Sequence, residues 1–349
     1  MRSLPIIVDV EAAVEVVRRR LREPFVSGSF YRGLANGTLS ASLTTRMQPW
    51  YGFDPEKPLS PQDPNALLLQ DPLTNRELER FTVIISAGDG SGPLLRRLVR
   101  RFNPIASRVA QLIIVCASGA PNQLGSELPI RVVTEDDYPS LITRFALGAF
   151  VKTRAVLLMD DDIEFNVGAV IEAFRIWQRA RDRIVGFDQQ QWDRGRLLFR
   201  RRRADESTWY SMTSTRIAFI NKRYLGLYMA KMYAAARIFV TQRKNCEDIL
   251  MNFVVANSLR LRLRDRNQTL PDSRGVGHAV FMQLREGEGM AVGRVRPTAG
   301  EVRDEATRAD CTAYFENLFG TDILGRSEAS AYFSAALGRT CFRHVDDAR

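Results

Sequence analysis

The stretch Ala155-Val-Leu-Leu-Met159, followed at once by Asp160-Asp-Asp162, is the strongest single indication of the fold. A short apolar run of this length is typical of a buried strand. Three consecutive carboxylates repel one another, so they need a counter-charge or free contact with water. A divalent cation such as Mn²⁺ or Mg²⁺ supplies a counter-charge, because these ions prefer carboxylate oxygens. A solvated acidic turn is the alternative, but the position directly after a strand favours a metal site.

Apolar strands alternate with helical segments on both sides of this stretch. Strands are predicted at residues 81–86, 112–116, 130–133, 155–159 and 184–187, and helices at residues 93–102, 141–151 and 167–179. This alternation indicates a mostly parallel sheet that is covered by helices on both faces. In such sheets ligands bind beyond the carboxyl ends of the strands, which is where the three aspartates lie. We therefore expect an α/β domain with its site at that edge.

The bulk composition narrows the class of protein. The chain has 349 residues, of which 45% are hydrophobic and 26% charged, which excludes a fully disordered or collagen-like chain. No apolar run approaches the roughly 20 residues that a membrane-spanning helix needs. A net charge of +10 fits a phosphate-bearing or polyanionic partner, and fits equally a basic surface that keeps the protein soluble. The 4 cysteines are too scattered for a zinc cluster and there are only 2 histidines, so oxygen atoms would hold any metal.

A second motif is Asn245-Cys-Glu-Asp-Ile-Leu-Met-Asn-Phe253. Its carboxylates, Glu247 and Asp248, fall at the start of a predicted helix, where the positive end of the helix dipole stabilises negative charge. On these residues alone, helix capping is the simpler interpretation.

Five segments of the chain occur in a distinctive order and spacing. They are Asp160–Asp162, Ser140-Leu-Ile-Thr-Arg-Phe145, Ile184-Val-Gly-Phe187, Tyr210-Ser211 and Asn245–Phe253. Together they resemble the exostosin-type glycosyltransferases, glycosyltransferase family 64, which are relatives of the heparan sulfate polymerases. The resemblance covers about residues 81–320, and its most specific element is the motif around Glu247 and Asp248.

The resemblance implies a GT-A fold, with a mixed, mostly parallel central sheet and helices on both faces. We expect this glycosyltransferase domain over residues 79–325. A loop-rich N-terminal extension is expected to wrap around it over residues 1–78, where prolines are dense, and a C-terminal helix and tail to follow over residues 326–349. The implied reaction is a metal-dependent, retaining transfer of a sugar, expected to be an N-acetylhexosamine. The donor would be a UDP-sugar and the cofactor Mn²⁺ or Mg²⁺.

The resemblance also implies roles for residues around the donor. Asp162 would be the direct metal ligand, with Asp160 as a second candidate ligand. Asp160 and Asp161 would contact the ribose or shape the site. Arg144 would face the nucleotide-sugar, and Ser86-Ala87, at the end of the first strand, would help to bind the nucleotide.

Further roles fall on the C-terminal half of the domain. Asp248 would lie beneath the reacting sugar, either as a transient nucleophile or as an electrostatic stabiliser. Arg308 would grip the diphosphate. In the family the corresponding cysteines are bonded, so the resemblance pairs Cys246 with Cys311.

The expected partners are a nucleotide-sugar donor and a glycan or glycolipid acceptor. Arginines 194, 196 and 200–203 form a basic cluster that would suit an acceptor with an acidic group, or that is a solvated loop. Residence in the Golgi or ER lumen is expected, through a membrane anchor absent from this chain, with the cytoplasm as the alternative. A nucleic-acid-binding protein is an alternative interpretation of the sequence, but no recognised binding motif supports it and the arginines are spread along the chain. A metal-dependent phosphohydrolase would need more acidic or histidine ligands.

Overall fold

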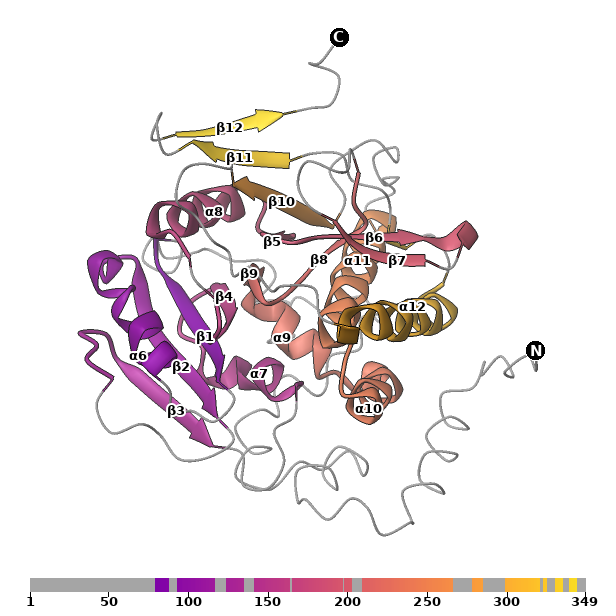
Figure 1. The fold of residues 1–349 in the computed structure, drawn as a ribbon, viewed down its shortest axis with the longest axis horizontal. Coiled ribbons are helices and arrows are strands. Elements are labelled where there is room, and N and C mark those ends of the chain that lie inside the picture. Colours follow the sequence, from indigo (N-terminus) through magenta and orange to yellow (C-terminus); the bar gives the residue numbers. More distant parts are fainter. Residues whose placement is uncertain are drawn as a thin grey trace.

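The fold is that of a computed structural model (Figure 1), which describes residues 79–87, 93–116, 124–134, 141–163, 165–196, 198–202, 209–265, 278–284, 299–320, 323–324, 330–334 and 339–343. The wrapping extension predicted for residues 1–78 lies outside these ranges.

Nine of the described strands form one sheet in the order β12-β11-β10-β5-β9-β4-β1-β2-β3. They are β1 (Phe81–Ala87), β2 (Val109–Cys116), β3 (Ile130–Thr134), β4 (Ala155–Asp160), β5 (Ile184–Gly186), β9 (Ile217–Asn221), β10 (Ala279–Leu284), β11 (Ser330–Ser334) and β12 (Arg339–Arg343). Strand β9 is antiparallel to both of its neighbours and β12 is antiparallel to β11, whereas the other pairs are parallel. The prediction of a mixed, mostly parallel sheet is confirmed.

A small second sheet stands beside the large one. It consists of β6 (Gln189–Asp193), β7 (Leu198–Arg202) and β8 (Met212–Thr213), with β6 in the middle and both pairings antiparallel. Strand β6 follows β5 after only two residues, so the small sheet is tied closely to the centre of the large one.

Helices cover both faces of the large sheet, as predicted. On one face lie α6 (Pro93–Arg100) and α8 (Val167–Arg179), and on the other lie α7 (Thr143–Ala146), α9 (Lys222–Tyr228), α10 (Ala234–Arg243), α11 (Glu247–Asp265) and α12 (Ala299–Phe319). Successive side chains of β1 point to opposite faces of the sheet, so they belong alternately to the two core clusters. Val83 and Ile85 belong to the cluster that holds Phe174 of α8, whereas Ile84 belongs to the cluster that holds Phe253 of α11.

Local chemistry sets several of these boundaries. Helix α8 has the predicted bounds because the Asn166 side chain caps it by accepting hydrogen bonds from the backbone N–H groups of Gly168 and Ala169. The single helix predicted over residues 141–151 is divided into α7 and a 3₁₀ helix, η2 (Leu147–Phe150). The division falls next to Gly148, a residue with low helix propensity.

The prediction of a C-terminal helix over residues 326–349 is wrong. Strand β11 pairs in parallel with β10, and β12 pairs with β11, so the sheet continues past the predicted domain boundary at residue 325 (Figure 1). A helix could not satisfy the backbone N–H and C=O groups along the edge of β10, whereas a paired strand does.

Across the described ranges of the chain, no helix combines the length and the apolar character needed to span a membrane.

Candidate active site

Asp160–Asp162, which we call the acidic turn, lies at the carboxyl edge of the large sheet. Asp160 is the last residue of β4 and stands in register with Ser86, near the end of the parallel strand β1. The backbone N–H of Asp161 donates to the carbonyl oxygen of Ser86 at 3.0 Å. Ala87 follows as the buried last residue of β1. The structure thus brings Ser86-Ala87 beside the acidic turn, and their role toward a nucleotide stays a prediction.

Arg144 links the acidic turn to the start of α11. Its Nη1 donates to Asp160 Oδ1 at 2.7 Å and its Nη2 donates to Glu247 Oε1 at 2.9 Å. The Arg144 side chain is only 4% exposed. Burial acts to lower the pKa of Arg144, but the two carboxylates outweigh burial and raise it. Two motifs that are far apart in the sequence therefore meet around one buried guanidinium.

Asp248 is buried in the first turn of α11. The backbone N–H of Ile249 donates to its Oδ1 at 2.8 Å, and two side chains donate to its Oδ2. Arg308 Nη2, from α12, donates to Asp248 Oδ2 at 2.6 Å, and Gln190 Nε2, from β6, donates to the same oxygen at 3.0 Å. Burial raises the pKa of the neighbouring Glu247, and the Asp248 carboxylate raises it further, while Arg144 and Arg308 act to lower it. The carboxylates of Glu247 and Asp248 and the guanidinium groups of Arg144 and Arg308 thus compensate one another's charge in a buried part of the molecule.

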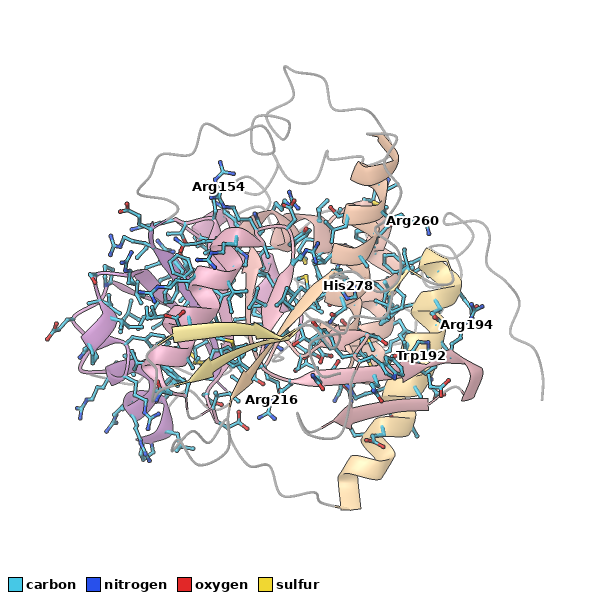
Figure 2. All side chains as sticks on the ribbon, turned by 90° about the horizontal axis from the view of Figure 1, so that it is seen from above. Arg154, Trp192, Arg194, Arg216, Arg260 and His278 are labelled. Carbon is cyan, nitrogen blue, oxygen red and sulfur yellow. A yellow bond between two sulfur atoms is a disulfide. The ribbon has the colours of Figure 1, made fainter. Side chains whose placement is uncertain are left out.

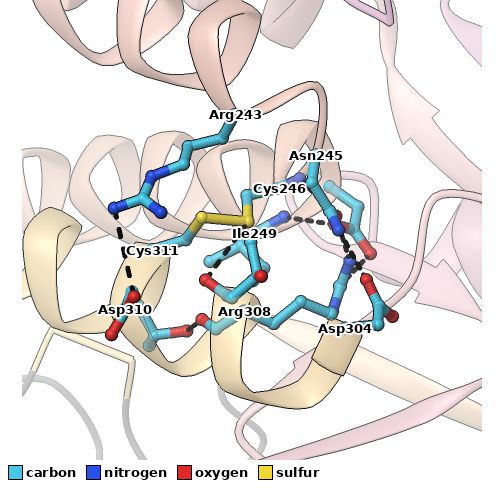
Figure 3. Close-up of a disulfide and its surroundings, with 11 residues drawn as sticks. Arg243, Asn245, Cys246, Ile249, Asp304, Arg308, Asp310 and Cys311 are labelled. Carbon is cyan, nitrogen blue, oxygen red and sulfur yellow. Dashed lines mark hydrogen bonds and ion pairs between the residues drawn. A yellow bond between two sulfur atoms is a disulfide. The ribbon is translucent and has the colours of Figure 1, made fainter. Parts of the chain in front are cut away.

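The loop before α11 is fixed by a disulfide between Cys246 and Cys311 of α12 (Figure 3). Cys246 has a φ of 77°, an unusual backbone conformation for a residue other than glycine. The Asn245 side-chain oxygen accepts hydrogen bonds from the backbone N–H of Cys246 at 2.7 Å and from Arg308 Nη1 at 3.1 Å. The disulfide and Asn245 together fix the position of Asp248 relative to Arg308.

The acidic turn also contacts Arg216, which immediately precedes β9. Arg216 Nη2 lies 2.7 Å from Asp162 Oδ2, and its Nε lies 3.3 Å from Asp160 Oδ2. Burial acts to lower the pKa of Arg216, but Asp162 and Asp160 outweigh it and raise the pKa. Figure 2 shows Arg216 nearer the margin of the fold than the buried His278.

The acidic turn has the chemistry of a metal site that substrate would complete. Within the ranges that the structure describes, no group of three or more His, Cys, Asp or Glu side chains gathers as a ready-made metal site. Mg²⁺, however, is usually held by one or two carboxylates together with substrate phosphates rather than by a cage of protein ligands. Asp162 fits that arrangement, because its side chain is 53% exposed, and Asp160 lies beside it.

The comparison with known families agrees with this geometry. The glycosyl transferase family 64 domain matches residues 81–333, which is more than half of the chain. The chain belongs to glycosyltransferase family 64. The matched range includes the acidic turn, Asp248 and Arg308.

Individual relatives in the family cover parts of the chain. Glucosamine inositolphosphorylceramide transferase 1 of Arabidopsis thaliana is 31% identical over 185 residues, which are 52% of this chain and 24% of that protein. An exostosin-like-3 homolog of Caenorhabditis elegans is 33% identical over 189 residues, 53% of this chain and 23% of that protein. Glycosylinositol phosphorylceramide mannosyl transferase 1 of Arabidopsis thaliana is 37% identical over 143 residues, 38% of this chain and 42% of that protein. The matches thus span less than half the length of each of these relatives.

The chain is also similar to a solved structure, that of GalNAc-T7 with UDP, GalNAc and Mn²⁺. The match covers 41% of this chain and 36% of that one, at 11% identity and a TM-score of 0.31. A likeness this small supports no inference about ligands.

Three residues that contact this candidate site were not predicted from the sequence. Gln190 had a signal, because three consecutive glutamines in a buried strand are unusual (each is at most 7% exposed) and buried polar groups need partners. Asn252 lies inside the quoted motif. Its side-chain amide forms hydrogen bonds with the backbone of Thr213 and of Asp248. Arg216 had no signal, since a single arginine before a strand is ordinary in a chain with 50 basic residues.

Proposed function

We propose that this chain is a metal-dependent, retaining glycosyltransferase that moves a sugar from a UDP-sugar to a glycan or glycolipid acceptor. The observation that carries the proposal is the contact of Arg144 with both Asp160 and Glu247, which brings a candidate metal site next to the buried Asp248. Membership of glycosyltransferase family 64 supports the reaction class. An N-acetylhexosamine is the donor sugar we favour.

The acidic turn would serve the departing diphosphate. Asp162, with Asp160, would hold Mn²⁺ or Mg²⁺, and such an ion stabilises the negative charge that develops on a leaving diphosphate. The exposed Asp162 carboxylate can be reached from solvent, whereas Asp160 is tied to Arg144. Asp161, Ser86 and Ala87 would contribute to nucleotide binding at the same edge of the sheet.

Asp248 would serve the reacting sugar. A carboxylate beneath the anomeric carbon favours the positive, oxocarbenium-like transition state, and it can also attack as a nucleophile. Gln190 and Arg308 both donate to Oδ2 of Asp248, so they set the orientation of the carboxylate. Arg308 would also neutralise part of the diphosphate charge.

The acceptor would be an acidic glycan or glycolipid. Strand β7, which carries three of the clustered arginines, pairs with β6 in the register Gln191↔Arg200, Gln190↔Arg201 and Gln189↔Arg202. The backbone of this basic strand thus runs beside the strand whose Gln190 contacts Asp248. Guanidinium groups suit carboxylate and phosphate recognition. The names of two relatives mention inositol phosphorylceramide, an acceptor class of that kind.

The Cys246–Cys311 disulfide supports the expectation of Golgi or ER residence, because disulfides persist in oxidising compartments.

Calorimetry of UDP binding tests the proposal. Chelation of Mn²⁺ removes the ion that would join the diphosphate to Asp162 and Asp160, so it should weaken UDP binding at least about tenfold, or ~1.4 kcal/mol. Asp162→Ala should weaken metal-dependent UDP binding and abolish UDP release from a panel of UDP-sugars. The matched control is Asp182→Ala, which removes an exposed aspartate that pairs with Arg223 instead. Equal affinity for UDP in chelator, or full transfer by Asp162→Ala, would contradict the proposal.

A further inference from the structure

Arg216 places a cation at the oxygens where a metal is expected. Its Nη2 lies 2.7 Å from Asp162 Oδ2, and its Nε lies 3.3 Å from Asp160 Oδ2, so one guanidinium contacts both candidate metal ligands. Asp160 is contacted on its other oxygen by Arg144. The charges of both carboxylates are therefore already compensated by the chain itself.

The backbone of Arg216 is held by hydrogen bonds, whereas its side chain is partly exposed to solvent. Its carbonyl oxygen accepts a hydrogen bond from the backbone N–H of Asp160 at 2.9 Å, and its N–H donates to the side-chain oxygen of Ser214 at 3.2 Å. The next residue, Ile217, pairs with Met159 in the sheet. The side chain is 23% exposed, so it lies at the boundary with solvent, where rotation about its own bonds would move it off the acidic turn.

We propose that Arg216 is a built-in competitor of the divalent cation, and that the metal binds the acidic turn only when the Arg216 guanidinium moves away. Like charges cannot share these oxygens at close range, because a bound Mg²⁺ sits about 2.1 Å from a ligand oxygen, inside the hydrogen-bond distance of a guanidinium. The inference rests on the proposed function, in which Asp162 and Asp160 hold the metal.

The competition links metal binding to nucleotide binding. Metal alone must break two ion pairs of Arg216, and one of the two carboxylates that it gains, Asp160, stays paired with Arg144. A nucleoside diphosphate adds negative charge at the same edge, which offers further ligands to the metal and a new partner to the displaced guanidinium. Metal and UDP should therefore bind together, with metal weak in the absence of UDP.

Titration with Mn²⁺, followed by the electron paramagnetic resonance signal of the free ion, tests this inference without any turnover. We expect Arg216→Gln to bind Mn²⁺ at least about tenfold more tightly than the wild type when UDP is absent. With UDP present the difference should shrink or reverse. Arg216→Lys keeps a cation and should stay close to the wild type. Arg175→Gln makes the same charge change on α8, where Arg175 pairs with Glu172, and should also match the wild type.

The outcomes separate the inference from the proposed function. Suppose that the wild type binds Mn²⁺ with UDP, but Arg216→Gln has the wild-type affinity for Mn²⁺ without UDP. The competition is then overturned and the metal site stands. If Arg175→Gln gains as much affinity as Arg216→Gln, general charge is responsible and the inference also fails. If no variant binds Mn²⁺ even with UDP, the metal site and the inference fall together.

Discussion

The buried contact between Asp248 and Arg308 governs what a substitution at either residue does. Judged from the sequence, Asp248→Asn is nearly isosteric and should leave the melting temperature almost unchanged. In the structure, however, the two side chains are only 4% and 3% exposed and their charged atoms lie 2.6 Å apart. Removal of one charge leaves the other buried without its full compensation, a situation that typically costs about 3–5 kcal/mol.

A double-mutant cycle on this pair is therefore informative at the residue scale. We expect Asp248→Asn and Arg308→Gln each to lower the free energy of unfolding by about 3 kcal/mol, and the double variant to cost clearly less than the sum. Chemical denaturation of the four proteins measures this coupling. Transfer activity should be lost in both variants that lack Asp248, while Asp248→Asn should still bind UDP. Strictly additive costs would show that the two residues act independently.

At the scale of elements, the Cys246–Cys311 bond joins the start of α11 to α12 across a separation of 65 residues (Figure 3). Chain-entropy reasoning gives a loop of this length about 4 kcal/mol of stabilisation. The double variant Cys246→Ala/Cys311→Ala should lose roughly that amount, and should bind UDP less tightly because Arg308 and Asp248 are held less firmly.

Denaturation with and without a reducing agent checks this prediction. The wild type should be destabilised by reduction, whereas the double variant should not respond. Cys116→Ala is the control, since Cys116 is buried at the end of β2 and outside the bond, so this variant should keep the response to reduction. A wild type that is indifferent to reduction would refute the assigned contribution.

Elements and site residues differ in how far the sequence predicts them. Helix α8 was predictable because its cap, Asn166, and its apolar face are local features. Strands β11 and β12 were not, because each exists through pairing with an edge that another part of the chain provides. The same distinction holds in the site. The order of the motifs predicted the acidic turn and Asp248 as site residues, whereas Arg216 approaches that turn only after β9 has paired with β4.

At the scale of the whole molecule, His278 couples stability to pH. It is buried immediately before β10 (Figure 2). Its Nε2 lies 3.1 Å from Asn252 Oδ1. The Asn252 amide nitrogen donates to the carbonyl oxygens of Thr213 and Asp248, so Oδ1 is the acceptor and His278 donates from Nε2. Burial, reinforced by the nearby charge of Arg183, lowers the pKa of His278 from 6.5 to about 3. His278 therefore stays neutral in the folded protein at any physiological pH.

The direction of the pH effect follows from proton binding. Between pH 6.5 and about 3 the unfolded chain takes up a proton at His278 that the folded protein refuses, so acidification favours unfolding. The contribution is absent above pH 6.5 and approaches about 1.4 kcal/mol for each pH unit below it. From pH 7 to pH 5.5 the wild type should thus lose roughly 1 kcal/mol of stability through this residue alone.

Urea denaturation at pH 7 and pH 5.5, compared between the wild type and His278→Gln, isolates this contribution. The pH dependence of either protein taken by itself also contains a contribution from Glu247. Its raised pKa gives a contribution of the opposite sign, a stability that falls as pH rises. That contribution is common to both proteins and cancels in the difference. His278→Gln should be less stable than the wild type at pH 7 but should lose less on acidification. A wild-type dependence in His278→Gln would mean that the folded protein takes up a proton at His278 over this pH range just as the unfolded chain does, and that Asn252 does not hold it in the neutral form.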